Sequence, residues 1–586
     1  MASSSASRDD NNSPTITQRL LNTSFVAELT AQDESSDNEG SDIDPRDFDS
    51  DSDSEGDNNY YNNNEQNHRR GAGDAQTATT WERIADISAD QAPPINNFTG
   101  QYGPLFQPDD AAPVKYFENF FQPNTDAGVS LWELLVNETN KYQELYKRKN
   151  PVLKPASKVH QWQDVTVPQM KAFIGCVLNM GINRKHTIEE YWNTTDWSQD
   201  FPMFRHVFKL DTFKLILRFF HVSDSELEPP RGSPNYDQLY KFRPVLDHFN
   251  AAWAREFNLG REVSIDETIV GFKGRHSLVN YIRIKKHHQW GPKEYNLCDS
   301  KTGYCYETMY HTKTIRRSDH GQPFDVCDRL MAKHANKHHH LVIDNYYTSV
   351  ILAEKMLEKG IYVTGTIQPN RVRLPADMKT KLKNKGEIVA NRKGNLLAVN
   401  WVDRKQVRLL STCSTASMVE KTLYDGSTQE IPKVVVDYNR GMGGVDLSDQ
   451  MTDAYAGEFR TVKLWKKVVF HLIDRTCTNA YTCYRMNNNI QGKRLDHLHF
   501  LIKVVEGLIG DYREPRKRAG RPSLLPPAAK KTERHFLSKI PDGKRKKCVV
   551  CGQRREEGYK GSRITTWCED CGVGLCKGEC FAKFHK

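Results

Sequence analysis

Several aspartates lie where a folded chain would place carboxylates at the edge of a sheet. Asp344 directly follows the apolar run Leu341–Ile343, and a helical pattern that stops at Gly360 and the strand-like "IYVTGTI" come next. Because open α/β sheets keep their functional groups at the carboxyl ends of strands, this strand–helix–strand unit predicts such a position for Asp344. Asp266 has a similar place in the strand-like "REVSIDETIVGFKGR", where it shares one face with Ser264.

Two further aspartates belong to the segment "VVVDYNRGMGGVDLSDQM". Its glycines, Gly441, Gly443 and Gly444, end a strand-like run and permit a close approach to neighbouring backbone. A helix is predicted directly after them. On that helix Asp446 and Asp449 lie three residues apart, so both project from one face.

Aspartates gathered in this way bind hard divalent cations. Mg²⁺, or Mn²⁺ in its place, prefers oxygen ligands, and one or two protein carboxylates hold an ion whose shell is completed by substrate phosphates and water. Two such ions roughly 3.5–4 Å apart activate an attacking oxygen and stabilise a leaving one in phosphoryl transfer. For each aspartate taken singly, a helix cap, a turn or an ion pair stays open as the alternative.

A second group of residues suited to metal binding lies near the C-terminus. Two C-x2-C pairs, 16 residues apart, precede two more cysteines and a histidine: Cys548, Cys551, Cys568, Cys571, Cys576, Cys580 and His585. This spacing is typical of zinc sites. Seven ligands exceed one tetrahedral site and fall one short of two, which predicts a cross-braced domain with two Zn²⁺ and His535 as the candidate eighth ligand. One four-cysteine site with three spectator residues is the alternative.

Hydrophobic periodicity predicts the elements that position these residues. Helical spacing prevails from about Tyr116 to Leu259. A strand, a hairpin with the turn "DSKTG", a helix and the strand before Asp344 follow. Residues 369–432 alternate apolar and polar residues, which indicates a β-rich insertion with Trp401 in its core. A long helical stretch, "TVKLWKKVVFHLIDRTCTNAYTCYRM", comes after Asp449, so the fold class is α/β with a mixed sheet.

The charge of the chain is distributed unevenly. The 586 residues carry a net charge of +9, but twelve acidic residues and one arginine between Asp33 and Asp57 contribute −11, so the rest carries +20. Such a surplus favours a polyanionic partner. Residues 1–112 are rich in Ser, Asp and Asn and are predicted to be a disordered acidic tail. No apolar run approaches the ~18 residues of a membrane span, and no signal peptide is evident, which predicts a soluble intracellular protein without a membrane partner.

Three blocks, "SIDETIVGFKGR", "LVIDNYYTS" and "DYNRGMGGVDLSDQM", occur in this order and together resemble the piggyBac family of DNA transposases. The resemblance implies an RNase H-like catalytic core in which Asp266, Asp344 and Asp446 are catalytic and Asp449 is an additional metal-site carboxylate. It also implies a domain order: 113–260 and 456–512 as one discontinuous helical dimerisation and DNA-binding domain, 261–368 and 433–455 as the catalytic domain, 369–432 as the insertion, 513–543 as a basic linker, and 544–586 as the zinc domain.

The resemblance further implies a cut-and-paste reaction. The protein would bind the terminal inverted repeats of a transposon, excise the element through hairpin intermediates and integrate it at TTAA sites, acting at least as a homodimer. The basic, proline-rich linker and "GKRKK" at residues 543–547 indicate nuclear import. The predicted DNA contacts are the basic residues at the start of the long helix and in the first zinc loop: Lys463, Lys466, Lys467, Arg554, Arg555, Lys560 and Arg563.

Two other classes stay open. One is a domesticated, non-transposing protein that binds DNA or chromatin in a sequence-specific way. The four aspartates argue against it, because clustered carboxylates facing phosphates are useful only with a metal ion. The other is a structure-selective nuclease on the same fold, which the zinc segment and the insertion disfavour.

Overall fold

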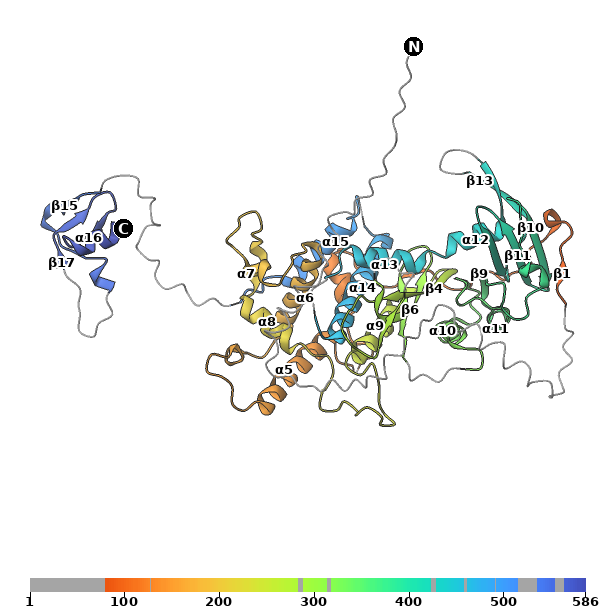
Figure 1. The fold of residues 1–586 in the computed structure, drawn as a ribbon, viewed down its shortest axis with the longest axis horizontal. Coiled ribbons are helices and arrows are strands. Elements are labelled where there is room, and N and C mark those ends of the chain that lie inside the picture. Colours follow the sequence, from red (N-terminus) through yellow and green to blue (C-terminus); the bar gives the residue numbers. More distant parts are fainter. Residues whose placement is uncertain are drawn as a thin grey trace, which may run out of the picture. The chain divides into compact units, whose positions relative to one another are not determined.

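The computed structural model describes residues 80–126, 128–282, 288–312, 318–422, 428–457, 461–490, 492–514, 535–553 and 563–585 (Figure 1). The chain divides into two compact units, Met1–Arg513 and Glu514–Lys586. Within the described ranges, no helix is both long enough and apolar enough to cross a membrane. Most of the predicted acidic tail (residues 1–79) and most of the predicted linker (residues 515–534) lie outside these ranges.

A mixed sheet forms the centre of the first unit. Its strands are β4 (Glu262–Ile269), β6 (Trp290–Asp299), β7 (Cys305–Tyr310), β8 (His340–Ile343) and β9 (Tyr362–Thr366). They lie in the order β7-β6-β4-β8-β9. Strand β6 is antiparallel to both β4 and β7, whereas β4, β8 and β9 are parallel to one another. The short β5 (Val279–Tyr281) pairs with the start of β6.

The connections follow the predicted order of strand, hairpin, helix and strand. In the turn between β6 and β7, Asp299 Oδ1 accepts hydrogen bonds from the backbone N–H and the hydroxyl of Thr302 at 2.8 and 2.7 Å. Gly303 then adopts φ +72°, a conformation that glycine tolerates best. Helix α10 (Gln322–Leu330) leads to β8, and α11 (Val350–Glu358) connects β8 to β9. The predicted hairpin and strand–helix–strand unit are therefore present.

The segment predicted to be a β-rich insertion is built of strands. These are β10 (Ile388–Lys393), β11 (Leu396–Val402), β12 (Gln406–Ser411), β13 (Met418–Thr422) and β14 (Thr428–Pro432). Strand β12 pairs with β9 in antiparallel fashion, so β10 to β12 continue the central sheet. Strands β13 and β14 form a separate ribbon. As predicted, Trp401 is buried in an apolar cluster of this segment.

The prediction of disorder up to residue 112 is wrong for residues 80–112. There, β1 (Glu82–Arg83) pairs with β10, and β2 (Gly103–Pro104) pairs with β3 (Phe257–Asn258). Between these pairings, Arg392 donates two hydrogen bonds to Asp90, at 2.9 and 2.7 Å. These contacts order a segment whose own composition is too polar to form a core.

Helices that precede the central sheet in the sequence and helices that follow it pack into one layer. They are α4 (Pro113–Asn119), α5 (Leu131–Lys149), α6 (Val167–Ile182), α7 (Pro202–Val207), α8 (Leu210–Phe219), α9 (Arg243–Glu256), α14 (Leu464–Met486) and α15 (His497–Ile509). Helix α14 contacts α4 and α9, and α15 contacts α6 and α4. The helices after the sheet segment therefore pack against those before it.

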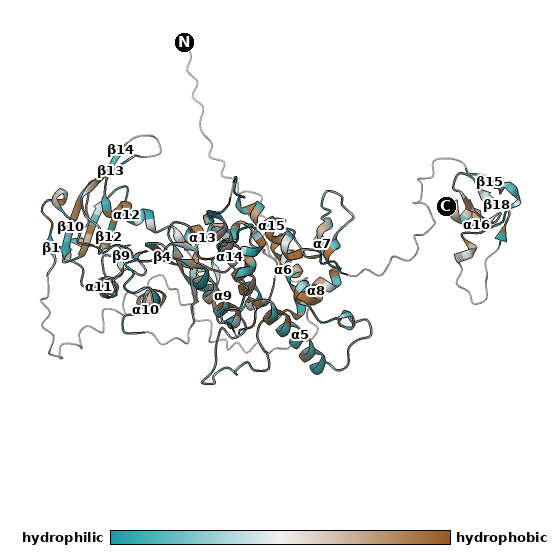
Figure 2. Ribbon diagram, turned by 180° about the vertical axis from the view of Figure 1, so that it is seen from behind, coloured by the Kyte–Doolittle hydropathy of each residue, from teal (hydrophilic) through white to brown (hydrophobic). Residues whose placement is uncertain are grey.

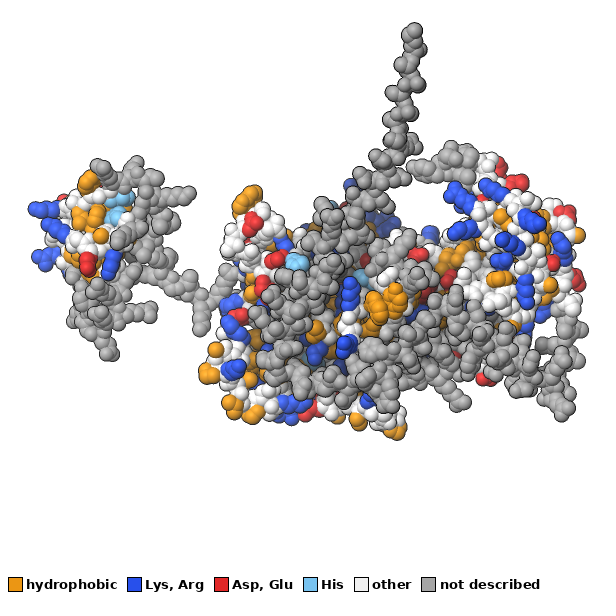
Figure 3. All heavy atoms as spheres, in the orientation of Figure 1, with side chains coloured by type: hydrophobic (Ala, Val, Ile, Leu, Met, Phe, Trp, Pro, Cys, Tyr) orange, Lys and Arg blue, Asp and Glu red, His pale blue; other side chains and the backbone are white. Residues whose placement is uncertain are grey.

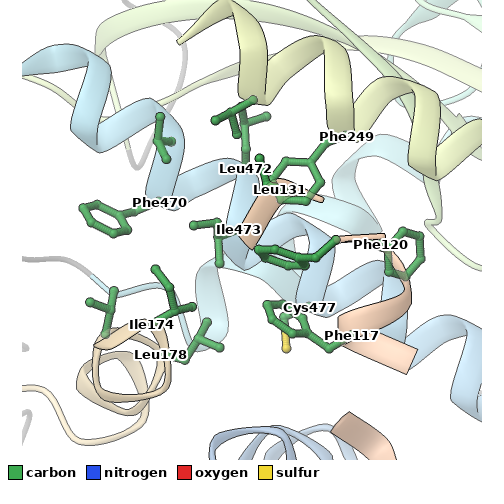
Figure 4. Close-up of a cluster of buried hydrophobic side chains, with 14 of the residues drawn as sticks. Phe117, Phe120, Leu131, Ile174, Leu178, Phe249, Phe470, Leu472, Ile473 and Cys477 are labelled. Carbon is green, nitrogen blue, oxygen red and sulfur yellow. The ribbon is translucent and has the colours of Figure 1, made fainter. Parts of the chain in front are cut away.

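This layer is held by a large apolar core. Figure 2 shows hydrophobic residues concentrated on α6 and α15, which pack against each other. In Figure 4, Phe117 and Phe120 from α4 and its C-terminal end lie near Phe249 of α9 and Ile473 of α14, and all four side chains are buried. Residues far apart in the sequence therefore share one core.

The glycine-containing segment before Asp446 differs from the prediction. Residues Lys433–Gly441 form helix α12 and Gly444–Ala454 form α13, so the expected strand-like run is wrong. Val434, Asp437 and Gly441 are buried at helical spacing. The valine run favours a strand by propensity alone, but packing of this face overrides that preference.

The second unit is a small α/β fold. It contains β15 (Leu537–Lys539), β16 (Lys546–Lys547), β17 (Arg563–Ile564), β18 (Thr566–Cys568), β19 (Val573–Gly574) and α16 (Glu579–His585). Strand β15 pairs with β18, which pairs with β19, and β16 pairs with β17. The structured part begins before residue 544, the predicted start of the zinc domain, because β15 is needed to complete its sheet.

Candidate active site and zinc centre

Asp266 and Asp344 are brought together by the parallel pairing of β4 and β8. The register of these strands places Ile265 opposite Ile343, and an aspartate follows each isoleucine. Asp266 Oδ1 accepts the backbone N–H of Glu267 at 2.8 Å, and Asp344 Oδ1 accepts that of Tyr346 at 2.9 Å. The two carboxylates thus occur at matching positions of neighbouring strands. Asp344 follows the end of β8, as predicted, whereas the prediction of a strand end for Asp266 is wrong, because β4 continues to Ile269 through its pairing with β6.

Asp446 reaches the same region from helix α13. It lies in the first turn of this helix, which packs against β4 and β6. At Gly444 a Cβ atom would come within 2.5 Å of Ser264 Oγ and 2.9 Å of the Asp299 carbonyl oxygen. Only glycine permits this approach, and it brings the start of α13 down onto the strand that carries Asp266.

The three aspartates act on one neighbouring group. The pKa of Tyr438, on α12, is raised by burial and by the negative charges of Asp344, Asp266 and Asp446. One phenol therefore lies within electrostatic reach of all three carboxylates, which come from two strands and a helix. Carboxylate oxygens are the donors that Mg²⁺ and Mn²⁺ prefer. Among the described residues, the groups of ligand atoms that lie within 4.8 Å of one another do not include these aspartates.

Asp449 lies one turn after Asp446, but its oxygens are engaged with protein donors. Oδ2 accepts the hydroxyl of Thr268 at 2.6 Å, and Oδ1 accepts Nη2 of Arg475 at 3.0 Å. Burial raises the pKa of Asp449 to about 6, against the opposing effects of the Arg475 charge and the Thr268 hydrogen bond. Asp449 is thus anchored behind the site.

Sequence patterns missed Arg475, Glu294 and Tyr438. The only sequence signal for Arg475 is the charged pair Asp474-Arg475 inside a helical stretch that is otherwise largely uncharged. Neither Glu294 nor Tyr438 stands out by spacing, because their partners come from distant elements.

The predicted DNA contacts at the start of α14 have different environments. Lys466 is 8% exposed, and its Nζ donates to the carbonyl oxygens of Leu217 and Arg218 at 2.6 and 3.1 Å. The prediction that Lys466 contacts DNA is therefore wrong, because its ammonium group caps the end of α8. Lys463 and Lys467 are half-buried at the start of the helix.

Of the predicted DNA contacts in the zinc segment, the structure describes Arg563. Arg563 is exposed on β17. Arg554, Arg555 and Lys560 lie outside the described residues. For these three residues the DNA contact stays a prediction.

A buried carboxyl group on α14 predicts an unusual pH dependence. Burial raises the pKa of Asp474 to about 7, despite the nearby charge of Lys467 and a hydrogen bond from the Gly457 N–H. The unfolded carboxyl titrates near ~3.9, so the folded chain holds an extra proton between these values and the free energy of unfolding falls as the pH rises from about 4 to about 7. We expect Asp474→Asn to remove this loss and to be more stable than the native chain at pH 8 by about 2–4 kcal/mol.

Thermal denaturation from pH 4 to pH 8 measures this effect. The gain in Tm should shrink towards pH 4, where Asp474 is protonated in the folded state and about half protonated in the unfolded state. The exposed Asp511→Asn serves as a control that should follow the native profile. A Tm difference that does not depend on pH would contradict the assignment.

The C-terminal cysteines and histidines form two groups of four. One contains Cys548, Cys551, Cys576 and Cys580, and the other His535, Cys568, Cys571 and His585; within each, the ligand atoms lie within 4.8 Å of one another. His535 therefore occupies the predicted eighth position. In sequence order the two groups interleave, which is the predicted cross-braced arrangement.

The geometry of both groups suits zinc. Cys551 Sγ and Cys576 Sγ are 3.7 Å apart, and Cys571 Sγ lies 3.4 Å from His535 Nδ1 and 3.5 Å from His585 Nε2. With Zn–S near ~2.3 Å and Zn–N near ~2.0–2.1 Å, a tetrahedron has edges of about 3.5–3.8 Å between such ligands. His585 uses its other nitrogen, Nδ1, to contact the Phe581 carbonyl oxygen at 2.9 Å, which fixes the ring orientation.

Comparisons with known proteins agree with both sites. Residues 112–481 match the family model described as Transposase IS4, and residues 530–586 match the DDE_Tnp_1-like zinc finger. The chain is 24% identical to human PiggyBac transposable element-derived protein 3 over 445 residues, covering 72% of this chain and 70% of that protein. It is also 24% identical to human PiggyBac transposable element-derived protein 5, covering 75% of this chain and 84% of that protein.

A solved structure shares the fold. The piggyBac transposase in a synaptic complex with hairpin DNA superimposes with a TM-score of 0.62 at 21% identity, covering 81% of this chain and 99% of that chain. The family model spans more than half of the sequence and includes all three converging aspartates. The chain therefore belongs to the Transposase IS4 family, as a member of the piggyBac group of transposases.

Proposed function

We propose that this protein is a cut-and-paste DNA transposase that cleaves and joins DNA strands at the carboxylate site. The support is the backbone arrangement: Asp266 and Asp344 occupy matching positions of the neighbouring strands β4 and β8, and Asp446 lies in the first turn of α13, which packs against β4. A carboxylate cluster held at a sheet edge suits phosphoryl transfer when divalent cations are present. The transposase family of the chain supports the same chemistry.

We propose an RNase H-like core for this site. The strand order β7-β6-β4-β8-β9, with an antiparallel hairpin followed by two parallel strands, supports it. Asp266, Asp344 and Asp446 would hold Mg²⁺ or Mn²⁺, which when bound supplies activation of the attacking oxygen and stabilisation of the leaving oxygen. We propose Asp449 as the additional carboxylate of the site. Since both of its oxygens accept hydrogen bonds from Thr268 and Arg475, it would hold the helix that carries Asp446 in place.

DNA is the proposed substrate and partner. Figure 3 shows Lys and Arg side chains gathered over the region of the insertion strands. Exposed basic residues of segment 369–432, outside the strands themselves, include Lys379, Lys381, Lys383, Lys385, Arg404 and Lys405. Such a surface favours phosphate contacts. The zinc finger, with exposed Arg563, would bind the terminal repeats, and we propose hairpin intermediates, TTAA targets, a homodimer in synapsis and a nuclear location as for the family that the chain resembles.

Excision in cells tests the proposal. The native chain should excise a marked element that bears its matched ends, and Asp344→Ala should reduce excision to background while binding of the ends is retained. The reason is that the substitution removes one carboxylate of the first unit and changes no residue of the zinc finger. Excision by Asp344→Ala at the native frequency would refute the proposed site.

A domesticated DNA-binding protein is the second candidate. The human relatives are, by name, derived from transposable elements. Tight binding of the ends by the native chain, together with no excision, would favour this candidate over the transposase.

A further inference from the structure

A buried ion-pair network lies directly behind the candidate site. Arg475 of α14 and Glu294 of β6 are both 0% exposed. Arg475 Nη1 donates to Glu294 Oε1 at 2.5 Å and to Asn296 Oδ1 at 2.8 Å, and Nη2 donates to Asp449 Oδ1 at 3.0 Å. Removing a charge from water costs several kcal/mol, so this arginine depends on the complete set of partners.

The network contacts the strand that carries Asp266. In the antiparallel register of β4 and β6, Asn296 lies opposite Asp266, and Glu294 lies opposite Thr268. Thr268 Oγ1 accepts Asn296 Nδ2 at 2.9 Å and donates to Asp449 Oδ2 at 2.6 Å. Because Thr268 is two residues after Asp266, both side chains belong to the same face of the sheet. Arg475 is thus bonded to the residue opposite Asp266.

The network also anchors the helix that carries Asp446. Gly444, two residues before Asp446, lies so close to Ser264 that no Cβ fits between them. Asp449, three residues after Asp446, is bonded to Thr268 and Arg475. Asp446 therefore sits between two points at which α13 is fixed to β4.

We propose that Arg475 is a positioning residue of the carboxylate site: from α14 it holds Asp449, and through Asp449 it fixes Asp446 relative to Asp266. The inference rests on the proposed function, because it takes the aspartates as the metal-binding site. It assigns the helical layer a part in that site, since the guanidinium comes from α14. The planar guanidinium binds three acceptors at fixed angles, which a lysine ammonium at the same place cannot reproduce.

Metal binding tests the role without relying on activity. Mn²⁺ is titrated by calorimetry into the full-length chain with its zinc bound. Arg475→Lys keeps the charge but loses the fork, and we expect Mn²⁺ binding to weaken about 10–100-fold, the usual effect of losing a group that orients a metal ligand. The matched control is Arg392→Lys on β10, which disturbs the two hydrogen bonds from Arg392 to Asp90 of the N-terminal segment; it should bind Mn²⁺ as the native chain does.

A double variant separates positioning from simple stabilisation. Glu294→Leu with Arg475→Met removes both members of the fully buried pair, and such replacements are often neutral or stabilising. Asp449 and His471 lose these partners, but their side chains are partly exposed, at 21% and 10%. We expect a native-like Tm with Mn²⁺ binding still weakened about 10-fold or more, because Asp449 has lost its donor. Native Mn²⁺ affinity in Arg475→Lys, or in the folded double variant, would overturn the inference.

A different result would refute the proposed function. If the native chain binds no Mn²⁺, or if Asp344→Asn binds it as tightly as the native chain, the carboxylate site itself is refuted. If the native chain binds Mn²⁺ and Asp344→Asn does not, the carboxylate site stands. The Mn²⁺ affinities of the Arg475 variants then test only the positioning role of Arg475.

Discussion

Asp344→Cys is expected to reduce DNA strand cleavage by at least ~10³-fold with Mg²⁺ and to regain part of the loss with Mn²⁺. The side chain at this position ends β8 beside Asp266. Mg²⁺ requires hard oxygen donors and binds a thiolate poorly, whereas Mn²⁺ binds softer ligands more readily. A loss of 10³-fold corresponds to ~4 kcal/mol of transition-state stabilisation, within the several kcal/mol that a bound metal ion supplies.

The measurement is cleavage of a duplex that carries the ends of the element, with either metal in turn. Asp377→Cys in the insertion is the matched control, because the structure places it outside the three elements that hold the converging aspartates. This control should cleave at the native rate with both metals. If Asp344→Cys were equally inactive with Mg²⁺ and with Mn²⁺, Asp344 would have a role in the fold and not in metal binding. If Asp344→Cys cleaved DNA with Mg²⁺ at the native rate, Asp344 would be excluded as a metal ligand.

Cys576→Ser is expected to unfold the C-terminal unit and to abolish binding of the transposon ends, with a loss of at least ~100-fold. Cys576 belongs to the same four-cysteine group as Cys548 and Cys551. The unit has a small apolar core made largely of its metal-binding cysteines, so the free energy of zinc binding supplies most of its folding free energy. Because the two groups interleave along the chain, loss of one should loosen the other.

Zinc content and DNA binding are measured on the same preparations. The native chain should hold two zinc ions, and Cys576→Ser should hold fewer while the Tm of the first unit stays unchanged. Cys413→Ser is the matched control, since this half-buried cysteine of the first unit belongs to neither group. If Cys576→Ser retained full zinc content and DNA binding, the alternative of one four-cysteine site with spectators would be favoured.

The sequence predicted those parts of both sites that depend on local patterns. An apolar run that ends in Asp344, followed by a capped helix and another strand, requires a parallel pair with the aspartate at its end. The C-x2-C spacing restricts the cysteines to metal binding in the same way, and the count of seven ligands led to His535. In each case the chemistry is encoded within a few residues of the chain.

Other features depend on neighbours that are distant in sequence. The valines of α12 favour a strand, and only packing of Val434, Asp437 and Gly441 makes a helix the better solution. Lys466 has the sequence context of a DNA-binding lysine, yet it caps α8 from 249 residues away. Residues 80–112 are ordered by partners on β10 and β3.

The sequence by itself therefore determined which residues could bind metal, because ligand type and spacing are local properties. Only the tertiary structure decided how the carboxylates are held. Arg475 and Glu294 are 181 residues apart in the chain, and neither pattern nor propensity relates them. Their pairing is enforced by burial, since a guanidinium removed from water needs carboxylate and amide oxygens to replace the water.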